Sequence, residues 1–166
     1  MTPQHDTQSK PEMPSPDSTD INILSYTSQI PFARHLGFEL TKFEGGESEI
    51  IYTAKPEHLN TFDVTHGGAC MTLLDITMAA AARSVAPETG VVTIEMKTSF
   101  MQPSVGPLHA RGTLIHRTAT LAFTEAKIYD ELERVCAHAT GTFKYVKRRL
   151  PTGPASANAM RPPSTD

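Results

Sequence analysis

The sequence has only two cysteines, Cys70 and Cys136, no tryptophan and no apolar run of about 18 residues. The cysteines form neither a CxxC pair nor a Cys/His ligand set, so we expect neither a disulfide scaffold nor a metal site. A membrane-spanning helix is excluded, and the first twenty residues lack the apolar core of a signal peptide. A net charge of −3 provides no basic surface for nucleic acid. We therefore expect a cytoplasmic protein with no membrane or nucleic-acid partner.

The two ends differ in composition from the middle of the chain. Residues 1–20 and 148–166 hold most of the 13 prolines and few large apolar side chains. Such segments cannot bury enough apolar surface to offset the entropy of ordering, so we expect two disordered tails. Residues 21–147 are then a single domain, of a size that one hydrophobic core supports.

The pattern within this domain predicts a short helical segment, a longer buried helix and six strands. Residues 21–36 read as a short helix or two, interrupted near Pro31. Residues 69–85 are rich in Ala, Leu and Met without Gly or Pro, which predicts a buried helix. Alternating apolar residues between turn residues predict strands over 38–43, 47–52, 91–101, 108–116, 119–129 and 135–145. This order favours an α+β fold with an antiparallel sheet wrapped around one central helix.

Asp75 is the only charged residue of the predicted buried helix before Arg83. No cation lies one helical turn away in either direction. If Asp75 faces the interior, burial raises its pKa and makes it a candidate general base or nucleophile. If it lies on a narrow exposed stripe with Thr72 and Ala79, it has no such role.

The segment His66-Gly67-Gly68 directly precedes this helix. Two glycines allow a ligand to approach the backbone closely, and free N–H groups at a helix N-terminus can hold an oxyanion. The same three residues are equally an ordinary turn at a helix start. Taken singly, Asn60 reads as a turn residue and Thr93 as an ordinary strand residue.

The spacing of these residues resembles a known family. Asn60 precedes His66-Gly67-Gly68 by six residues, and Asp75 follows His66 by nine. Downstream come Thr93-Ile94-Glu95-Met96 and the aromatic-x-x-Pro sequence of residues 100–103. Over about residues 32–146 the chain resembles the PaaI-like branch of the hotdog thioesterases, within the 4-hydroxybenzoyl-CoA thioesterase superfamily.

The resemblance implies a hotdog fold, a homodimer or a dimer of dimers, and hydrolysis of acyl-CoA thioesters without a cofactor. It implies that the Gly67 amide, helped by Asn60, polarises the thioester carbonyl. Asp75 from the other subunit would activate a water or attack directly, and Thr93, a serine in some relatives, would position that water. His66 would shape the site.

Two other functions remain open on the sequence. A hotdog domain that binds acyl-CoA as a sensor would need no central carboxylate, and a hotdog dehydratase or hydratase would use a His as its base. The CoA phosphates could meet basic residues that surface charge explains equally well: Arg83, Lys97, Arg117 and residues 147–149. Met71, Leu74 and Met78 could line an acyl pocket or simply pack in the core.

Overall fold

The computed structural model describes residues 26, 27 and 29–147. Both predicted tails, 1–20 and 148–166, lie outside the described residues. The described part forms one six-stranded antiparallel sheet in the order β1-β2-β4-β5-β6-β3. Its strands are β1 (Glu39–Glu44), β2 (Glu47–Thr53), β3 (Thr89–Phe100), β4 (Pro107–Arg117), β5 (Leu121–Tyr129) and β6 (Val135–Lys147).

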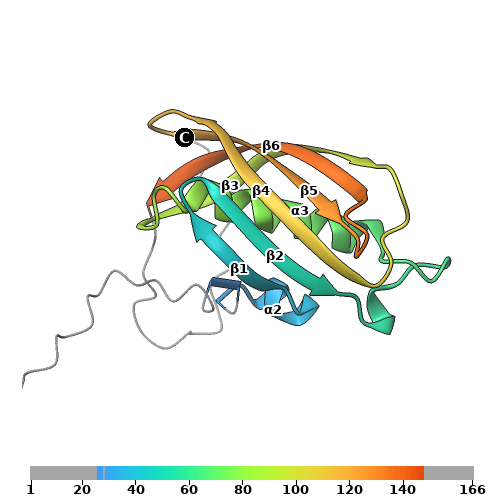
Figure 1. The fold of residues 1–166 in the computed structure, drawn as a ribbon. Coiled ribbons are helices and arrows are strands. Elements are labelled where there is room, and N and C mark those ends of the chain that lie inside the picture. The colour runs from blue at the N-terminus through green and yellow to red at the C-terminus, as the bar shows by residue number, and fades with distance from the viewer. Residues whose placement is uncertain (1–25, 28, 148–166) are drawn as a thin grey trace, which may run out of the picture.

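The long helix α3 (Gly67–Arg83) packs along one face of this sheet (Figure 1). Its buried side chains come from nearly all sides of the helix, as a helix enclosed by a curved sheet requires. Gly112 of β4 allows a close approach, because a Cβ there would lie 2.9 Å from the carbonyl oxygen of Thr77. The Ser48 hydroxyl donates to the same oxygen at 2.6 Å. The predicted hotdog architecture is confirmed.

The short helix α2 (Pro31–Leu36) begins at the proline that was expected to interrupt it. Proline fits the first helical position, because that residue's missing N–H would have no partner inside the helix. The helix ends at Gly37, whose φ of 79° is left-handed and costs a glycine little. In the described residues no helix combines the length and apolar character needed to cross a bilayer.

The start of α3 also differs from the prediction, which placed both glycines ahead of the helix. The helix begins at Gly67, and His66 is its N-cap: His66 Nδ1 accepts a hydrogen bond from the Gly68 amide at 2.9 Å. The low helix propensity of glycine hid this first turn from the sequence. The cap offsets that low propensity by satisfying an amide that the helix itself leaves without an acceptor.

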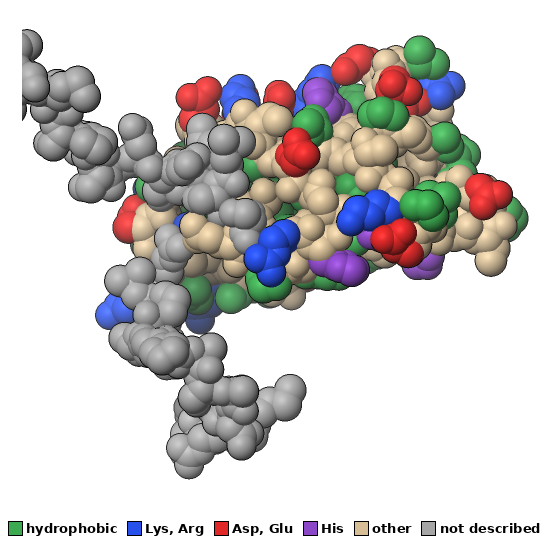
Figure 2. Space-filling view, turned by 90° about the horizontal axis from the view of Figure 1, so that it is seen from below, with side chains coloured by type: hydrophobic (Ala, Val, Ile, Leu, Met, Phe, Trp, Pro, Cys, Tyr) green, Lys and Arg blue, Asp and Glu red, His purple; other side chains and the backbone are tan. Residues whose placement is uncertain are grey.

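Strands β1 and β3 form the two edges of the sheet. Apolar side chains on β3 are left partly open to solvent: Val92, Ile94 and Phe100 are 48%, 55% and 54% exposed. On the face shown in Figure 2, charged side chains of both signs are interspersed with apolar and other polar ones.

Candidate functional site

Asp75 lies on a partly exposed stripe of α3, together with Thr72 and Ala79, and its carboxylate reaches strand β3. The Thr93 hydroxyl donates to Asp75 Oδ1 at 2.8 Å. Burial raises the pKa of Asp75, and the hydrogen bond from Thr93 offsets only part of that rise. Among the described residues no cation pairs with this carboxylate. Asp75 therefore has the raised proton affinity of a candidate base.

The register of β3 explains why Thr93 reaches the helix. Thr93 lies opposite Phe143 of β6, whose side chain is fully buried, so both project toward α3. A β-bulge follows between Thr93 and Glu95. Beyond it Glu95 lies opposite Thr142 and accepts a hydrogen bond from its hydroxyl at 2.7 Å.

The N-terminus of α3 leaves one backbone donor free. The Gly68 amide donates to the His66 side chain, and the Ala69 and Cys70 amides both donate to the His66 carbonyl oxygen. The Gly67 amide has no acceptor within the described part of the chain. It lies at the positive end of the helix dipole, where developing negative charge is favoured.

Two neighbouring side chains are held so that each presents a donor. Since His66 Nδ1 accepts from the Gly68 amide, the neutral ring carries its proton on Nε2. Asn60 Oδ1 accepts from the Phe62 amide at 2.8 Å and from the Val64 amide at 3.4 Å. Its Nδ2 group is thereby the end that remains available. Asn60, His66 and Gly67 thus each present a donor.

Gly67 and Asp75 lie far apart within one chain. They are separated by eight residues along a straight helix, or about 12 Å. A base and an oxyanion donor must both lie within hydrogen-bonding reach of one reacting group. The structure therefore joins Asp75 to Thr93, whereas Asn60 bonds within its own loop, to Phe62 and Val64, ahead of α3.

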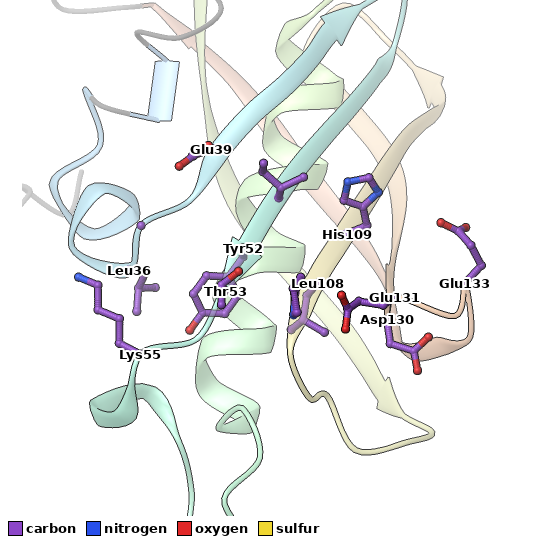
Figure 3. A pocket seen from close by; sticks show the side chains of 13 residues that line it. Leu36, Glu39, Tyr52, Thr53, Lys55, Leu108, His109, Asp130, Glu131 and Glu133 are labelled. Atoms are coloured by element: carbon purple, nitrogen blue, oxygen red, sulfur yellow. The ribbon is translucent and has the colours of Figure 1, made fainter.

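A large cavity in the described part of the chain lies elsewhere. It has a volume of about 720 Å³ and is located where β2 ends and β4 begins, near α2 and the β5–β6 turn (Figure 3). None of the five predicted site residues lines it. Two of its acids are already paired, Asp130 with Arg134 and Glu133 with Arg111. No feature of the sequence pointed to this cavity.

The remaining candidates have mostly structural roles. Arg83 donates from Nε to the Thr89 carbonyl oxygen at 2.9 Å and from Nη2 to that of Pro87 at 3.1 Å, which holds the turn after α3. Arg117 donates to the Val85 carbonyl oxygen at 3.3 Å. Lys97 and Lys147 are exposed, and residues 148–149 lie outside the described range.

Of the three candidate pocket residues, Leu74 and Met78 are fully buried in the core, and only Met71 is partly exposed. Cys70 and Cys136 are buried free thiols, and burial raises the pKa of both. Among the described residues no cluster of His, Cys, Asp and Glu is arranged to hold a metal ion.

Comparison with known proteins shows which family the sequence resembles. The sequence pattern of the thioesterase superfamily matches residues 62–137, a stretch that contains His66, Gly67, Asp75 and Thr93. Over this stretch, which is just under half of the chain, the sequence is similar to the thioesterase superfamily. The resemblance expected from the spacing of these residues is confirmed at this level.

The individual proteins that this chain resembles differ widely from it in sequence. "Putative esterase SSO2140" from Saccharolobus solfataricus is 26% identical over 118 residues, which cover 70% of this chain and 84% of that protein. The PaaI protein from the phenylacetic acid degradation operon of E. coli superposes with a TM-score of 0.66 at 19% identity, over 74% of this chain and 96% of PaaI. A thioesterase from Haemophilus influenzae superposes with a TM-score of 0.68 at 21% identity, over 75% and 90%. At these identities the superpositions show a shared fold.

Proposed function

We propose that this protein hydrolyses acyl-coenzyme A thioesters to the free acid and coenzyme A, without a cofactor. The observation that carries the proposal is the Asp75–Thr93 pair, a half-buried carboxylate with a raised pKa that no cation in the described part of the chain neutralises. A purely structural acid in an apolar helix would be expected to have a neutralising partner. The names of the relatives, an esterase and a thioesterase among them, support the same reaction class.

The free donors at the start of α3 would hold the carbonyl oxygen of the thioester. The Gly67 amide is the primary donor, with Asn60 Nδ2 and His66 Nε2–H as its neighbours. As water adds to the carbonyl carbon, negative charge develops on that oxygen. Preorganised donors at a helix N-terminus stabilise such charge more in the transition state than in the substrate.

Asp75 would be the general base. Its Oδ1 accepts from Thr93, which leaves Oδ2 to take a proton from the attacking water. The lone pairs of the Thr93 hydroxyl can accept the second hydrogen of that water and so orient it. The tetrahedral intermediate then breaks its C–S bond and expels a thiolate, a good leaving group that needs little help from an acid.

Asp75 and the free donors at the start of α3 would meet only between two copies of the chain. Because Gly67 and Asp75 are about 12 Å apart on one helix, the Asp75 that serves a given Gly67 would come from the partner subunit. The exposed apolar edge strand β3 is the surface on which we expect a second copy to pair across a two-fold axis.

A steady-state screen tests the proposal directly. Release of free thiol would be followed with acetyl-, hexanoyl-, benzoyl- and phenylacetyl-CoA, with the corresponding p-nitrophenyl esters as oxygen-ester controls. We expect at least one CoA thioester to be hydrolysed more efficiently than its oxygen ester. Tight binding of every thioester without thiol release would instead identify an acyl-CoA sensor. Dehydration of a 3-hydroxyacyl-CoA without thiol release would identify a dehydratase.

A further inference from the structure

The aromatic ring of Phe100 lies against the first residue of α3. A Cβ atom built on Gly67 would lie 3.4 Å from Phe100 Cζ and 3.6 Å from Cε1. The ring is thus in van der Waals range of the residue that carries the free amide. It is nevertheless 54% exposed, so part of its surface remains available to a ligand.

Backbone hydrogen bonds hold this ring in place. The Met101 amide, directly after Phe100, donates to the Cys136 carbonyl oxygen of β6 at 2.8 Å. Three residues further on, the carbonyl oxygen of the buried Ser104 accepts from the Thr65 amide at 2.9 Å. The segment after β3 is therefore attached to the loop that leads into α3, and Phe100 keeps a defined position beside Gly67.

The two segments around the ring, residues 59–66 and 100–106, contain no lysine or arginine. Three exposed apolar side chains lie in these segments: Phe62, Met101 and Val105. Their only ionised group at neutral pH apart from histidine is Asp63. An anionic group held there would lack a cationic partner in these segments, and desolvating an unpaired charge is costly.

We propose that Phe100 is a specificity-determining residue, whose ring forms the wall of the acyl site beside the Gly67 amide and selects neutral, apolar acyl groups over acyl groups that carry a second carboxylate. This inference rests on the function proposed above. A carbonyl oxygen bound to the Gly67 amide lies about 2.9 Å from that nitrogen. The acyl carbons nearest the carbonyl then pass within contact range of the ring and bury its exposed part.

Binding of non-hydrolysable thioethers tests this wall separately from catalysis. The probes are S-(2-oxopropyl)-CoA, S-(2-oxohexyl)-CoA and S-(4-carboxy-2-oxobutyl)-CoA, thioethers whose ketone oxygen can accept from the Gly67 amide. They are titrated calorimetrically into the wild type, Phe100→Ala and Phe100→Tyr. Ile115→Ala is the matched control, since Ile115 is similarly exposed (59%). It lies on β4 two residues before Arg117, which donates to the Val85 carbonyl oxygen in the turn after α3, far along the chain from Gly67. Circular dichroism checks that every variant is folded.

We expect the wild type to bind the 2-oxohexyl thioether most tightly. Phe100→Ala should reduce the preference for 2-oxohexyl over both other probes by about tenfold, the scale on which a small change in an apolar pocket discriminates. Phe100→Tyr should keep the ring and restore the preference, and Ile115→Ala should leave it unchanged. The same shift should appear in kcat/KM for hexanoyl-CoA against succinyl-CoA.

The outcomes separate this inference from the proposed function. If thiol is released with an acyl preference that Phe100→Ala does not alter, the assignment of Phe100 as a specificity residue is wrong, and the proposed thioesterase activity stands. If selectivity among the probes depends on Phe100 but no acyl-CoA releases thiol, the role of Phe100 is supported and the proposed hydrolase activity is contradicted. A wild type that binds none of the three thioethers, or binds them without preference, would overturn the wall.

Discussion

The two edge strands of the sheet differ in length and in the apolar side chains that they expose. Strand β1 has six residues, and its exposed positions are polar or charged: Glu39, Thr41 and Glu44. Strand β3 has twelve residues and exposes the apolar Val92, Ile94 and Phe100 among polar and charged positions: Thr93, Glu95, Lys97 and Ser99. Charges and a short length discourage an edge from pairing with another chain, whereas a long edge with exposed apolar residues invites it.

Two contacts of the proposed site involve the edge strand β3. Thr93 of β3 donates to Asp75, and Phe100 at the end of the same strand contacts Gly67. Nothing comparable lies on β1, whose Lys42 pairs with Glu47 of β2. An exposed edge with apolar residues, beside a carboxylate with a raised pKa, is what the proposed shared site requires.

The largest effect should come from removing the carboxylate beside β3. Asp75→Asn keeps the shape of the side chain and its bond from Thr93 but removes the base. General-base groups contribute on the order of 10²- to 10⁴-fold, so kcat should fall by that factor while the fold persists. Glu39→Gln on β1 removes one negative charge from the other edge and should leave turnover unchanged. Near-normal hydrolysis by Asp75→Asn would contradict the assignment of Asp75 as base.

The next effect should come from placing a charge on the apolar edge. Ile94→Lys on β3 should weaken pairing between two copies and convert the protein to a monomer, as judged by light scattering coupled to size-exclusion chromatography. If each site takes residues from both copies, as proposed, activity should fall with the dimer and recover in part at high protein concentration. Thr41→Lys on β1 should change neither property. A monomeric variant with full activity would contradict the shared site.

The local elements were largely predictable because their signals lie within a few residues. The apolar segment after Gly68 had helical composition without a breaker, and α3 occupies it. Alternation and turn residues located the strands. The pairing of β3 with β6 was not predictable, because β4 follows β3 in the chain but lies between β2 and β5. Strand order depends on how the whole sheet closes over α3.

The candidate site was predictable only in its residue types. Spacing identified Asn60, His66, Gly67, Asp75 and Thr93, and the structure adds the bond between the last two. The cap formed by His66 was missed because histidine is not a typical N-cap residue. The contact of Phe100 with Gly67 joins residues 33 positions apart, and only the tertiary structure reveals it.

A smaller effect should come from the hydroxyl group on β3. Thr93→Val keeps the branched shape but cannot donate to Asp75 or orient a water. We expect kcat to fall by about tenfold, less than for Asp75→Asn, because the base itself remains. Thr93→Ser keeps the hydroxyl and should retain most activity. Thr41→Val, the matched change on β1, should have no effect on kcat. Equal losses for Thr93→Val and Thr93→Ser would show that packing at β3, rather than the hydroxyl, matters.

The smallest effect concerns stability and follows from the raised pKa of Asp75. The folded carboxyl binds its proton more tightly than the unfolded one, whose ordinary pKa is 3.8. Its favourable contribution to folding is therefore complete below pH 3.8 and is lost as the pH rises through the folded pKa. Asparagine is neutral throughout, so the free energy of unfolding of Asp75→Asn should exceed that of the wild type at pH 7. Urea denaturation from pH 4 to pH 8 measures this difference, with Glu39→Gln as the control.

The difference should grow with pH and then level off once Asp75 is fully ionised in the folded protein. The same ionisation must precede general-base catalysis, so kcat/KM of the wild type should rise with pH over the same interval. Agreement between the two curves would assign one titrating group to both properties. A wild type more stable than Asp75→Asn at pH 7 would mean that the folded protein stabilises the carboxylate, contrary to the burial that raises its pKa.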